Sequence, residues 1–169
     1  RIKKVDVLIN NAGIAKTARI ADTTTEMFDN MFNVNVKGLF WMSKYAISKL
    51  NENGCVVNIS SLAGIKSFEE YGAYCATKAA VISLTKTMAL EFAKQKIRAN
   101  CIAPGIINTP IWEKMYGVQG KKMLKENEKY VLLSRAGTPE EIAKTAVFLC
   151  ENDYMTGETI LVDGGESIR

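Results

Sequence analysis

The sequence predicts an α/β fold in which a doubly wound parallel sheet carries helices on both faces. Short, continuously apolar segments alternate along the chain with longer segments of helical periodicity. Strands that are apolar at every position, rather than at every second position, are typical of parallel sheets buried on both faces. The 169 residues are enough for one domain with a sizeable core, and the sequence contains no internal repeat or low-complexity tract.

Four apolar segments have the length and composition of buried strands, and each of them ends in a turn. With the turn that follows each strand, they are Val5-Asp6-Val7-Leu8-Ile9 before Asn10-Asn11-Ala12-Gly13, Cys55-Val56-Val57-Asn58-Ile59 before Ser60-Ser61, Ile97 to Ala103 before Pro104-Gly105, and Thr159-Ile160-Leu161-Val162-Asp163 before Gly164-Gly165. The carboxyl ends of parallel strands are where open α/β sheets bind ligands, so these turns are the first place to look for a site.

The first helical segment is predicted to begin near Thr23 and to reach about Leu50. Thr23 lies three residues before Glu26, which is the spacing of a capping box. Apolar residues then recur with a helical rhythm, and Gly54 ends the segment before the second strand.

Two further helices are predicted, with an irregular stretch between them. An alanine-rich helix runs from about 71 to 93, and the stretch 109–134 is lysine-rich without clear periodicity. The last helix begins at Thr138-Pro139-Glu140-Glu141, which combines a cap, a first-turn proline and a capping-box glutamate, and it reaches about Cys150.

Composition excludes several classes of chemistry. The chain has no histidine, which rules out Ser-His-Asp and Cys-His catalysis and histidine-liganded metal sites within it, so we predict no metal. The net charge of +4 is spread along the chain, which favours a solvated surface over nucleic-acid binding, and no apolar run is long enough for a membrane span. The cysteines have no paired spacing and are expected to be free thiols in a reducing cytoplasm; they are Cys55, Cys75, Cys101 and Cys150.

Tyr74 and Lys78 form the candidate acid/base pair. Their i, i+4 spacing places both side chains on one face of the predicted helix, where an ammonium next to a phenol favours the phenolate and lowers its pKa. Such a spacing also occurs by chance as a surface pair. Ser61 adds context, because it follows a buried strand and its hydroxyl can donate a hydrogen bond to a substrate oxygen; an ordinary turn residue is the alternative.

Seven motifs occur in order at compatible spacing along almost the whole chain. They are Asn10-Asn11-Ala12-Gly13, Asn33-Val34-Asn35-Val36-Lys37-Gly38, Asn58-Ile59-Ser60-Ser61, Tyr74-Cys75-Ala76-Thr77-Lys78, Pro104-Gly105-Ile106-Ile107-Asn108-Thr109, Arg135 to Ala143, and Thr156 to Gly165. Together they resemble the single-domain short-chain dehydrogenase/reductases, and the pattern is closest to the 3-oxoacyl-(acyl carrier protein) reductases. The resemblance implies a Rossmann-type fold, of which this chain would hold strands 4–7 in a single incomplete domain.

The chain departs from the family at its beginning, because the Thr-Gly-x-x-x-Gly-x-Gly cofactor turn of the first strand and helix is not in it. A sheet that begins at Val5 also leaves an apolar edge strand without a partner. We therefore expect that an N-terminal cofactor-binding unit of about 70–90 residues belongs to the fold, at roughly 30 residues for each strand–helix–strand unit.

The resemblance implies specific roles for the matching residues. Tyr74 would be the general acid/base, Lys78 would lower its pKa and bind the nicotinamide ribose, and Ser61 would polarise the substrate carbonyl. Asn35 would hold a helix carbonyl and water in a proton relay; a polar residue within a helix is the alternative. Asn11 is equally compatible with a structural role. The implied cofactor-binding residues are Asn11, Ala12, Gly13, Tyr74, Lys78, Pro104, Gly105, Ile107 and Thr109.

The expected activity is hydride transfer between NAD or NADP and a carbonyl or secondary alcohol. The residues that choose between the two cofactors follow the second strand of the full fold, which is not in this chain. A 3-oxoacyl-(acyl carrier protein) reductase is favoured. The alternatives are a sugar, polyol or other secondary-alcohol dehydrogenase, and a non-catalytic member of the fold that senses dinucleotides.

The resemblance also implies a mobile substrate lid at about 110–135 and a homodimer or homotetramer formed through the two long helices. The substrate partner is expected to be a small or acyl-carrier-linked carbonyl compound. Lid side chains either line an apolar pocket or pack the lid onto the body; they are Trp112, Met115, Tyr116 and Met123. Lid lysines either meet an acidic carrier protein or form a solvated face; they are Lys121, Lys122 and Lys125.

Overall fold

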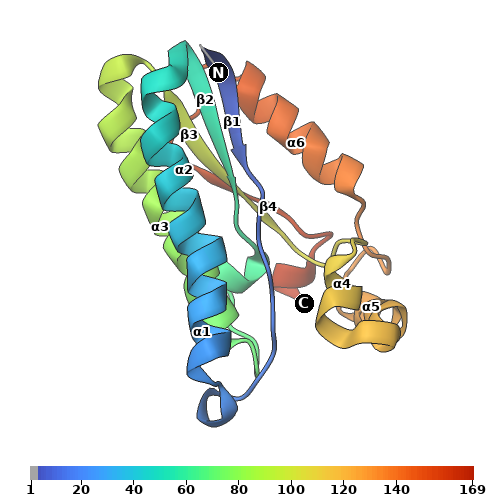
Figure 1. Cartoon of the computed structure of the whole chain (residues 1–169). Helices are drawn as coiled ribbons and strands as arrows, with labels where there is room; N and C mark the ends of the chain where they lie inside the picture. Colours follow the sequence, from blue (N-terminus) through green and yellow to red (C-terminus); the bar gives the residue numbers. More distant parts are fainter. Residues whose placement is uncertain (1–3) are drawn as a thin grey trace.

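Four parallel strands form one sheet in the order β1-β2-β3-β4 in the computed structural model, which describes residues 4–169 (Figure 1). The strands are β1 (Val5–Asn10), β2 (Leu50–Ile59), β3 (Arg98–Pro104) and β4 (Thr159–Val162). Each neighbouring pair is parallel. The predicted α/β class and the predicted parallel sheet are therefore confirmed.

Helices cover both faces of this sheet. The segments α1 (Thr25–Phe32) and α2 (Leu39–Ala46) follow one another and lie with α3 (Gly72–Phe92) on one face, and α6 (Pro139–Glu151) lies on the other (Figure 1). The short helices α4 (Ile111–Tyr116) and α5 (Gly120–Asn127) lie beyond the carboxyl ends of the strands. Single 3-10 turns occur at Ile20–Asp22, Ile47–Lys49, Leu62–Gly64, Ala93–Gln95, Gly117–Gln119, Glu128–Tyr130 and Glu166–Ile168.

The first helical segment differs from the prediction in its cap. Thr24, not Thr23, is the N-cap, because its hydroxyl accepts a hydrogen bond from the backbone N–H of Met27 at 3.2 Å. The hydroxyl of Thr23 instead donates to the carbonyl of Arg19 at 2.9 Å. By residue type Thr23 and Thr24 are equally suited to cap the helix, and the turn before them decides which of the two does so.

The same segment is not a uniform α-helix. A π-helical segment at Asn33–Gly38 separates α1 from α2, and the chain enters β2 at Leu50 rather than at Cys55. Leu50 pairs with Val5, and the register of the two strands shifts before Val7 pairs with Cys55. The predicted strand thus begins five residues early, with an irregular first part.

The start of α6 agrees with the prediction. Thr138 accepts a hydrogen bond from the N–H of Glu141, and the Glu141 carboxylate accepts one from the N–H of Thr138 at 2.8 Å. Pro139 occupies the first turn. The reciprocal pair satisfies two backbone donors that the helix itself leaves free.

The core consists of two apolar layers that share the central strands. Val56 and Ala99 face α3, where they pack with Val81 and other residues of that helix. Val57 and Ile102 face α6, where they pack with Leu149. Successive residues of β2 thus enter opposite layers, which explains why Cys55, Val56 and Val57 are apolar at consecutive positions.

Strand β1 forms one edge of the sheet. Two of its apolar side chains, Val7 and Ile9, are 40% and 50% exposed. This is the open apolar edge that the sequence predicted. No helix of the described residues is both long and apolar enough to cross a membrane.

A buried polar network joins the strands to the helices below the site. The Asn58 side chain, fully buried in β2, accepts a hydrogen bond from Asn10 at 2.8 Å and donates to Thr85 of α3 at 2.9 Å. Asn10 also donates to Ser43 of α2 at 3.0 Å. Buried polar groups cost little when they are all paired, and the network fixes the relative positions of β1, β2, α2 and α3.

We predict that Asn58→Leu lowers the free energy of unfolding by about 2–3 kcal/mol, because Asn10 and Thr85 lose their buried partner without access to water. Urea unfolding of the full-length protein measures this change. Asn51→Ala, which removes an exposed hydrogen bond to Asp6 from the same strand, is the control and should cost less than about 1 kcal/mol. Equal losses in the two variants would contradict a role for the buried network.

Candidate active site

A cavity of about 750 Å³ lies at the carboxyl ends of the strands. It is bordered by the residues that follow β1, β2 and β3, by the first turns of α3, and by α4 and α6. Its volume is within the usual range for a site that binds a small molecule or cofactor. The position agrees with the rule that open parallel sheets bind ligands at this edge.

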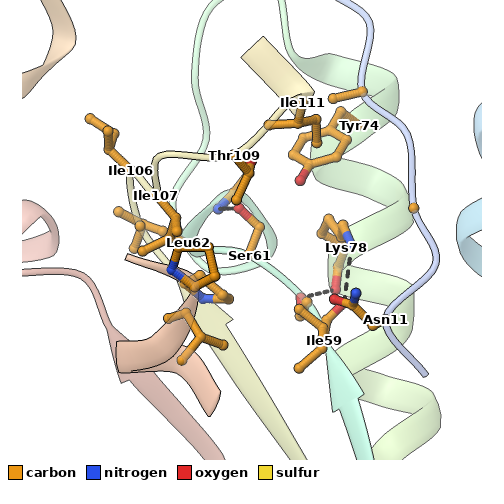
Figure 2. A pocket seen from close by; sticks show the side chains of 18 of the residues that line it. Asn11, Ile59, Ser61, Leu62, Tyr74, Lys78, Ile106, Ile107, Thr109 and Ile111 are labelled. Carbon is orange, nitrogen blue, oxygen red and sulfur yellow. Dashed lines mark hydrogen bonds between the residues drawn. The ribbon is translucent and has the colours of Figure 1, made fainter. Parts of the chain in front are cut away.

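Tyr74 and Lys78 project into this cavity from the same face of α3 (Figure 2). The Lys78 ammonium lies 5.7 Å from the centre of the Tyr74 ring and donates a hydrogen bond to the carbonyl of Ile59 at 3.0 Å. Lys78 is only 5% exposed, whereas Tyr74 is half-buried. The predicted pair is thus brought together at the end of β2.

Ser61 faces Tyr74 across the cavity, and the Tyr74 hydroxyl points toward the space between Ser61 and Lys78 (Figure 2). The Ser61 backbone is extended, and its side-chain oxygen accepts a hydrogen bond from the N–H of Ala63 at 3.1 Å. That contact uses an acceptor position of the hydroxyl and leaves its proton free to donate. Ser61 can therefore donate to an oxygen atom held beside Tyr74.

The turn after β2 is locked to the backbone of α3. The Ser60 hydroxyl donates to the carbonyl of Lys78 at 2.7 Å, in the opposite sense to the bond from Lys78 to Ile59. A Cβ atom on Gly64 would lie 2.8 Å from the carbonyl group of Lys78, so only glycine permits this close approach. The lock places Ser61 at a fixed position relative to Tyr74.

Asn35 is buried and acts from behind the cavity rather than within its wall. Its side-chain oxygen accepts from the N–H of Ile14 at 2.8 Å, and its amide donates to the carbonyl of Ile14 and to the hydroxyl of Thr77 at 2.9 and 3.0 Å. The resemblance implied a helix carbonyl as the partner, but the carbonyl belongs to the loop after β1. Asn35 therefore joins that loop to α3 beside Lys78.

Burial raises the pKa of Tyr74 to about 12 from its ordinary value of 10.0, and the nearby Ser61 hydroxyl offsets only part of this rise. Burial also lowers the pKa of Lys78 from 10.5 to about 8. In this structure the effect of burial on the Tyr74 pKa therefore outweighs the lowering expected from Lys78. The physical reason is that burial favours the neutral form of both groups, and the ammonium lies against Ile59 rather than against the phenol oxygen.

Most of the implied cofactor-binding residues line the same cavity. Those that do are Asn11, Gly13, Tyr74, Lys78, Pro104, Gly105, Ile107 and Thr109. Ala12 does not line it. Gly13 lies close behind the pair, because a Cβ atom there would be 3.4 Å from both the Lys78 ammonium and the Asn35 oxygen.

The sequence did not reveal two parts of the wall. One is the apolar face of α6, whose helical spacing was visible but whose orientation was not; it contributes Ile142, Ala143, Ala146 and Val147. The other is Glu166, whose carboxylate accepts a hydrogen bond from the N–H of Ile106 at 3.1 Å and whose pKa burial raises. No local signal marks Glu166, because its partner is 60 residues away. Within residues 4–169, no cluster of three or more histidine, cysteine, aspartate or glutamate side chains is arranged to hold a metal ion.

Comparisons with known proteins define the class to which this fold and site belong. The family model described as enoyl-(acyl carrier protein) reductase matches residues 1–167. A 3-oxoacyl-(acyl-carrier-protein) reductase of Thermotoga maritima is 40% identical over 166 residues, which are 96% of this chain and 66% of the relative. A diacetyl reductase of Staphylococcus aureus is 35% identical over 96% of this chain and 68% of its own length.

Solved structures agree with this class. The structure of ElxO with NADP bound is 34% identical, with a TM-score of 0.86 over 97% of this chain and 68% of that chain. A short-chain dehydrogenase family protein from Francisella tularensis has a TM-score of 0.89 at 28% identity, over 98% of this chain and 72% of that chain. The chain belongs to the short-chain dehydrogenase/reductase family. It spans 62–66% of the length of four of its curated relatives.

We predict that buried Lys78 makes stability depend on pH. Between pH 8 and 10.5 the unfolded chain binds a proton at Lys78 that the folded chain does not, so the contribution of Lys78 to the free energy of unfolding should rise with pH across this window. In Lys78→Met this contribution, at most about 3 kcal/mol, should vanish. Urea unfolding of both proteins at pH 7, 8, 9 and 10 measures the difference. Lys86→Met, exposed on the same helix, is the control, and a wild-type profile parallel to that of Lys78→Met would contradict the assignment.

Proposed function

We propose that the full-length protein is an NAD(P)-dependent oxidoreductase that interconverts a carbonyl group and a secondary alcohol. The observation that carries the proposal is the convergence of the Tyr74 and Ser61 hydroxyl groups in one cavity, with Lys78 fixed behind them. Family membership supports the same reaction class. A protein that only sensed dinucleotides would have no chemical need for this set of side chains.

The cavity suits the nicotinamide end of a dinucleotide. Asn11, Gly13 and the loop from Pro104 to Thr109 would hold it. Gly13 has no side chain, so the chain can pass close to the Lys78 ammonium at this point. When bound, the nicotinamide supplies or accepts the hydride. NADP in the solved relative ElxO supports this cofactor class, while the choice between NAD and NADP depends on residues outside this chain.

Tyr74 supplies the proton in the direction of reduction. With its pKa near 12 the phenol is protonated at neutral pH, which is the form that can donate to a developing alkoxide. Ser61 donates a hydrogen bond to the same oxygen and stabilises its growing negative charge. In oxidation the roles reverse, and Tyr74 must first lose its proton, which requires additional positive charge beside it.

Asn35 and Lys78 support the Tyr74 and Ser61 hydroxyl groups from behind the cavity. Asn35 holds the hydroxyl of Thr77, which in turn donates to the carbonyl of Tyr74 at 2.8 Å. Lys78 is directed at the end of β2 by its bond to Ile59, and we propose that it also binds the ribose hydroxyl groups of the cofactor. Hydrogen bonds thus fix Thr77 to Asn35 and Lys78 to Ile59, next to Tyr74.

A carbonyl compound is the proposed substrate, and an acyl thioester of the 3-oxoacyl type is supported by the 40% identity to the Thermotoga reductase. The charges of the lid segment (110–135) bear on whether the substrate is linked to an acidic carrier protein. Three of its five lysines, at 121, 122 and 125, each have a carboxylate within 4.0 Å, on Glu113, Glu126 and Glu128. These exposed pairs offset only part of the positive charge of the segment, so both carrier-linked and carrier-free carbonyl compounds remain candidate substrates.

We also propose a homodimer or homotetramer formed through α2 and α3. Large apolar side chains are exposed on these helices, among them Phe40, Met42, Tyr45 and Leu90.

We propose a cytoplasmic location because all four cysteines are free thiols, which suits a reducing compartment.

We predict that Tyr74→Phe in the full-length enzyme lowers kcat at least about 100-fold, the scale expected for loss of a general acid/base. Cofactor affinity should stay within about threefold, since the ring remains in place. Oxidation of NAD(P)H with diacetyl and with a 3-oxoacyl thioester as substrates measures turnover, and fluorescence titration measures cofactor binding. Tyr154→Phe, at a fully exposed position away from the cavity, is the matched control. Turnover near that of wild type would contradict the assignment of Tyr74, and cofactor binding without turnover by the wild type would favour a sensor.

A further inference from the structure

A continuous series of aromatic contacts connects Tyr74 to the lid segment. The rings of Tyr74 and Tyr71 meet edge to face, with centroids 6.1 Å apart, and the Tyr71 hydroxyl lies 2.8 Å from the hydroxyl of Tyr116 at the end of α4. Tyr116 in turn stacks on Trp112 at 6.1 Å. The hydrogen bond between the two phenols is the only polar link in this series.

The same contacts place α4 against the site. The indole N–H of Trp112 donates to the carbonyl of Ile107 at 2.9 Å, which joins α4 to the loop after β3. Phe68 packs edge to face on Tyr71 at 6.2 Å. Phe68, Tyr71, Trp112 and Met115 all line the cavity, so this side of it is an aromatic and apolar wall.

Charges around the cavity are unfavourable for an anion. Lys78 is the only cationic side chain among the described residues of the wall, and its ammonium is engaged by Ile59. Two carboxylates, Glu151 and Glu166, belong to the same wall. A substrate carboxylate that entered would lose its water without gaining a cationic partner, and that loss is costly.

We propose that Tyr71 and Tyr116 form a latch that holds α4 over the substrate end of the cavity, and that the wall behind the latch selects uncharged, apolar carbonyl compounds. The substrate preference rests on the proposed oxidoreductase function, whereas the latch does not. Burial raises the pKa of Tyr71, so its hydroxyl keeps its proton and can donate to or accept from the hydroxyl of Tyr116. Tyr71 contacts both Tyr116 and the ring of Tyr74, so it joins α4 to the site.

The first experiment compares two ketones that differ by one charge, acetophenone and 4-acetylbenzoate, as substrates of the full-length holoenzyme. Wild type should favour acetophenone by at least about tenfold in kcat/KM, because desolvating an unpaired carboxylate costs more than 1.4 kcal/mol. Equal use of the two ketones, or preference for 4-acetylbenzoate, would overturn the substrate preference while the oxidoreductase function stands. Reduction of neither ketone by an enzyme that reduces diacetyl or the 3-oxoacyl thioester would overturn the substrate preference alone, whereas reduction of none of the four compounds would overturn both.

The second experiment tests the latch through Tyr71→Phe, Tyr116→Phe and the double variant. Each change removes one hydroxyl and keeps the ring, so KM for acetophenone should rise about three- to tenfold while kcat stays within about twofold. The double variant should match either single variant, because both remove the same hydrogen bond. Tyr130→Phe, on the exposed surface of the same lid segment, is the matched control and should leave KM unchanged.

Limited trypsin digestion gives a readout that needs no activity. Loss of the latch should speed cleavage after Lys114 and Lys121 by about threefold or more in Tyr71→Phe and Tyr116→Phe, and not in Tyr130→Phe. Mass spectrometry identifies the cleaved bonds. Cleavage of the Tyr71→Phe and Tyr116→Phe variants at the wild-type rate would overturn the latch. So would a double variant in which the effects of the two substitutions on KM or on the cleavage rate multiply. Neither outcome depends on which ketones the wild type reduces.

Discussion

Helix α3 is fastened to the carboxyl end of β2 by two hydrogen bonds that run in opposite directions, and the site depends on this contact. Lys78 donates to Ile59, and Ser60 donates to Lys78. Tyr74 lies one helical turn before Lys78, and Ser61 directly follows Ser60. A shift of the helix by one residue would therefore separate the two hydroxyl groups that must reach a single carbonyl oxygen.

Burial that makes this contact rigid also determines its chemistry. It moves the pKa of Tyr74 up to about 12 and that of Lys78 down to about 8, so at neutral pH Tyr74 is a neutral phenol while Lys78 still carries its charge. A neutral phenol suits proton donation, while a phenolate needs more positive charge than Lys78 alone supplies. The polar groups behind the pair are paired with one another, as Asn35 is with Thr77, and this lets a low-dielectric site remain well ordered.

Local signals were sufficient for the presence of four strands, the helix at Gly72–Phe92, the cap at Thr138 and the approach of Tyr74, Lys78 and Ser61, although not for the start of β2. The features that differ from the prediction or were missed at the site depend on partners far away in the chain. The carbonyl held by the predicted residue Asn35 belongs to Ile14, 21 residues away, and Glu166 binds the N–H of Ile106, 60 residues away. The direction of the Tyr74 pKa shift was missed for a related reason, because the spacing of two residues carries no information about how deeply they are buried.

The most direct test of the account is a crystal structure of the full-length protein with oxidised NAD or NADP and a bound ketone. We predict a carbonyl oxygen within about 3.2 Å of both the Tyr74 hydroxyl and the Ser61 hydroxyl, with the carbonyl carbon facing the nicotinamide. A ketone that binds in the cavity with its oxygen on any other pair of groups would contradict the proposed roles of Tyr74 and Ser61.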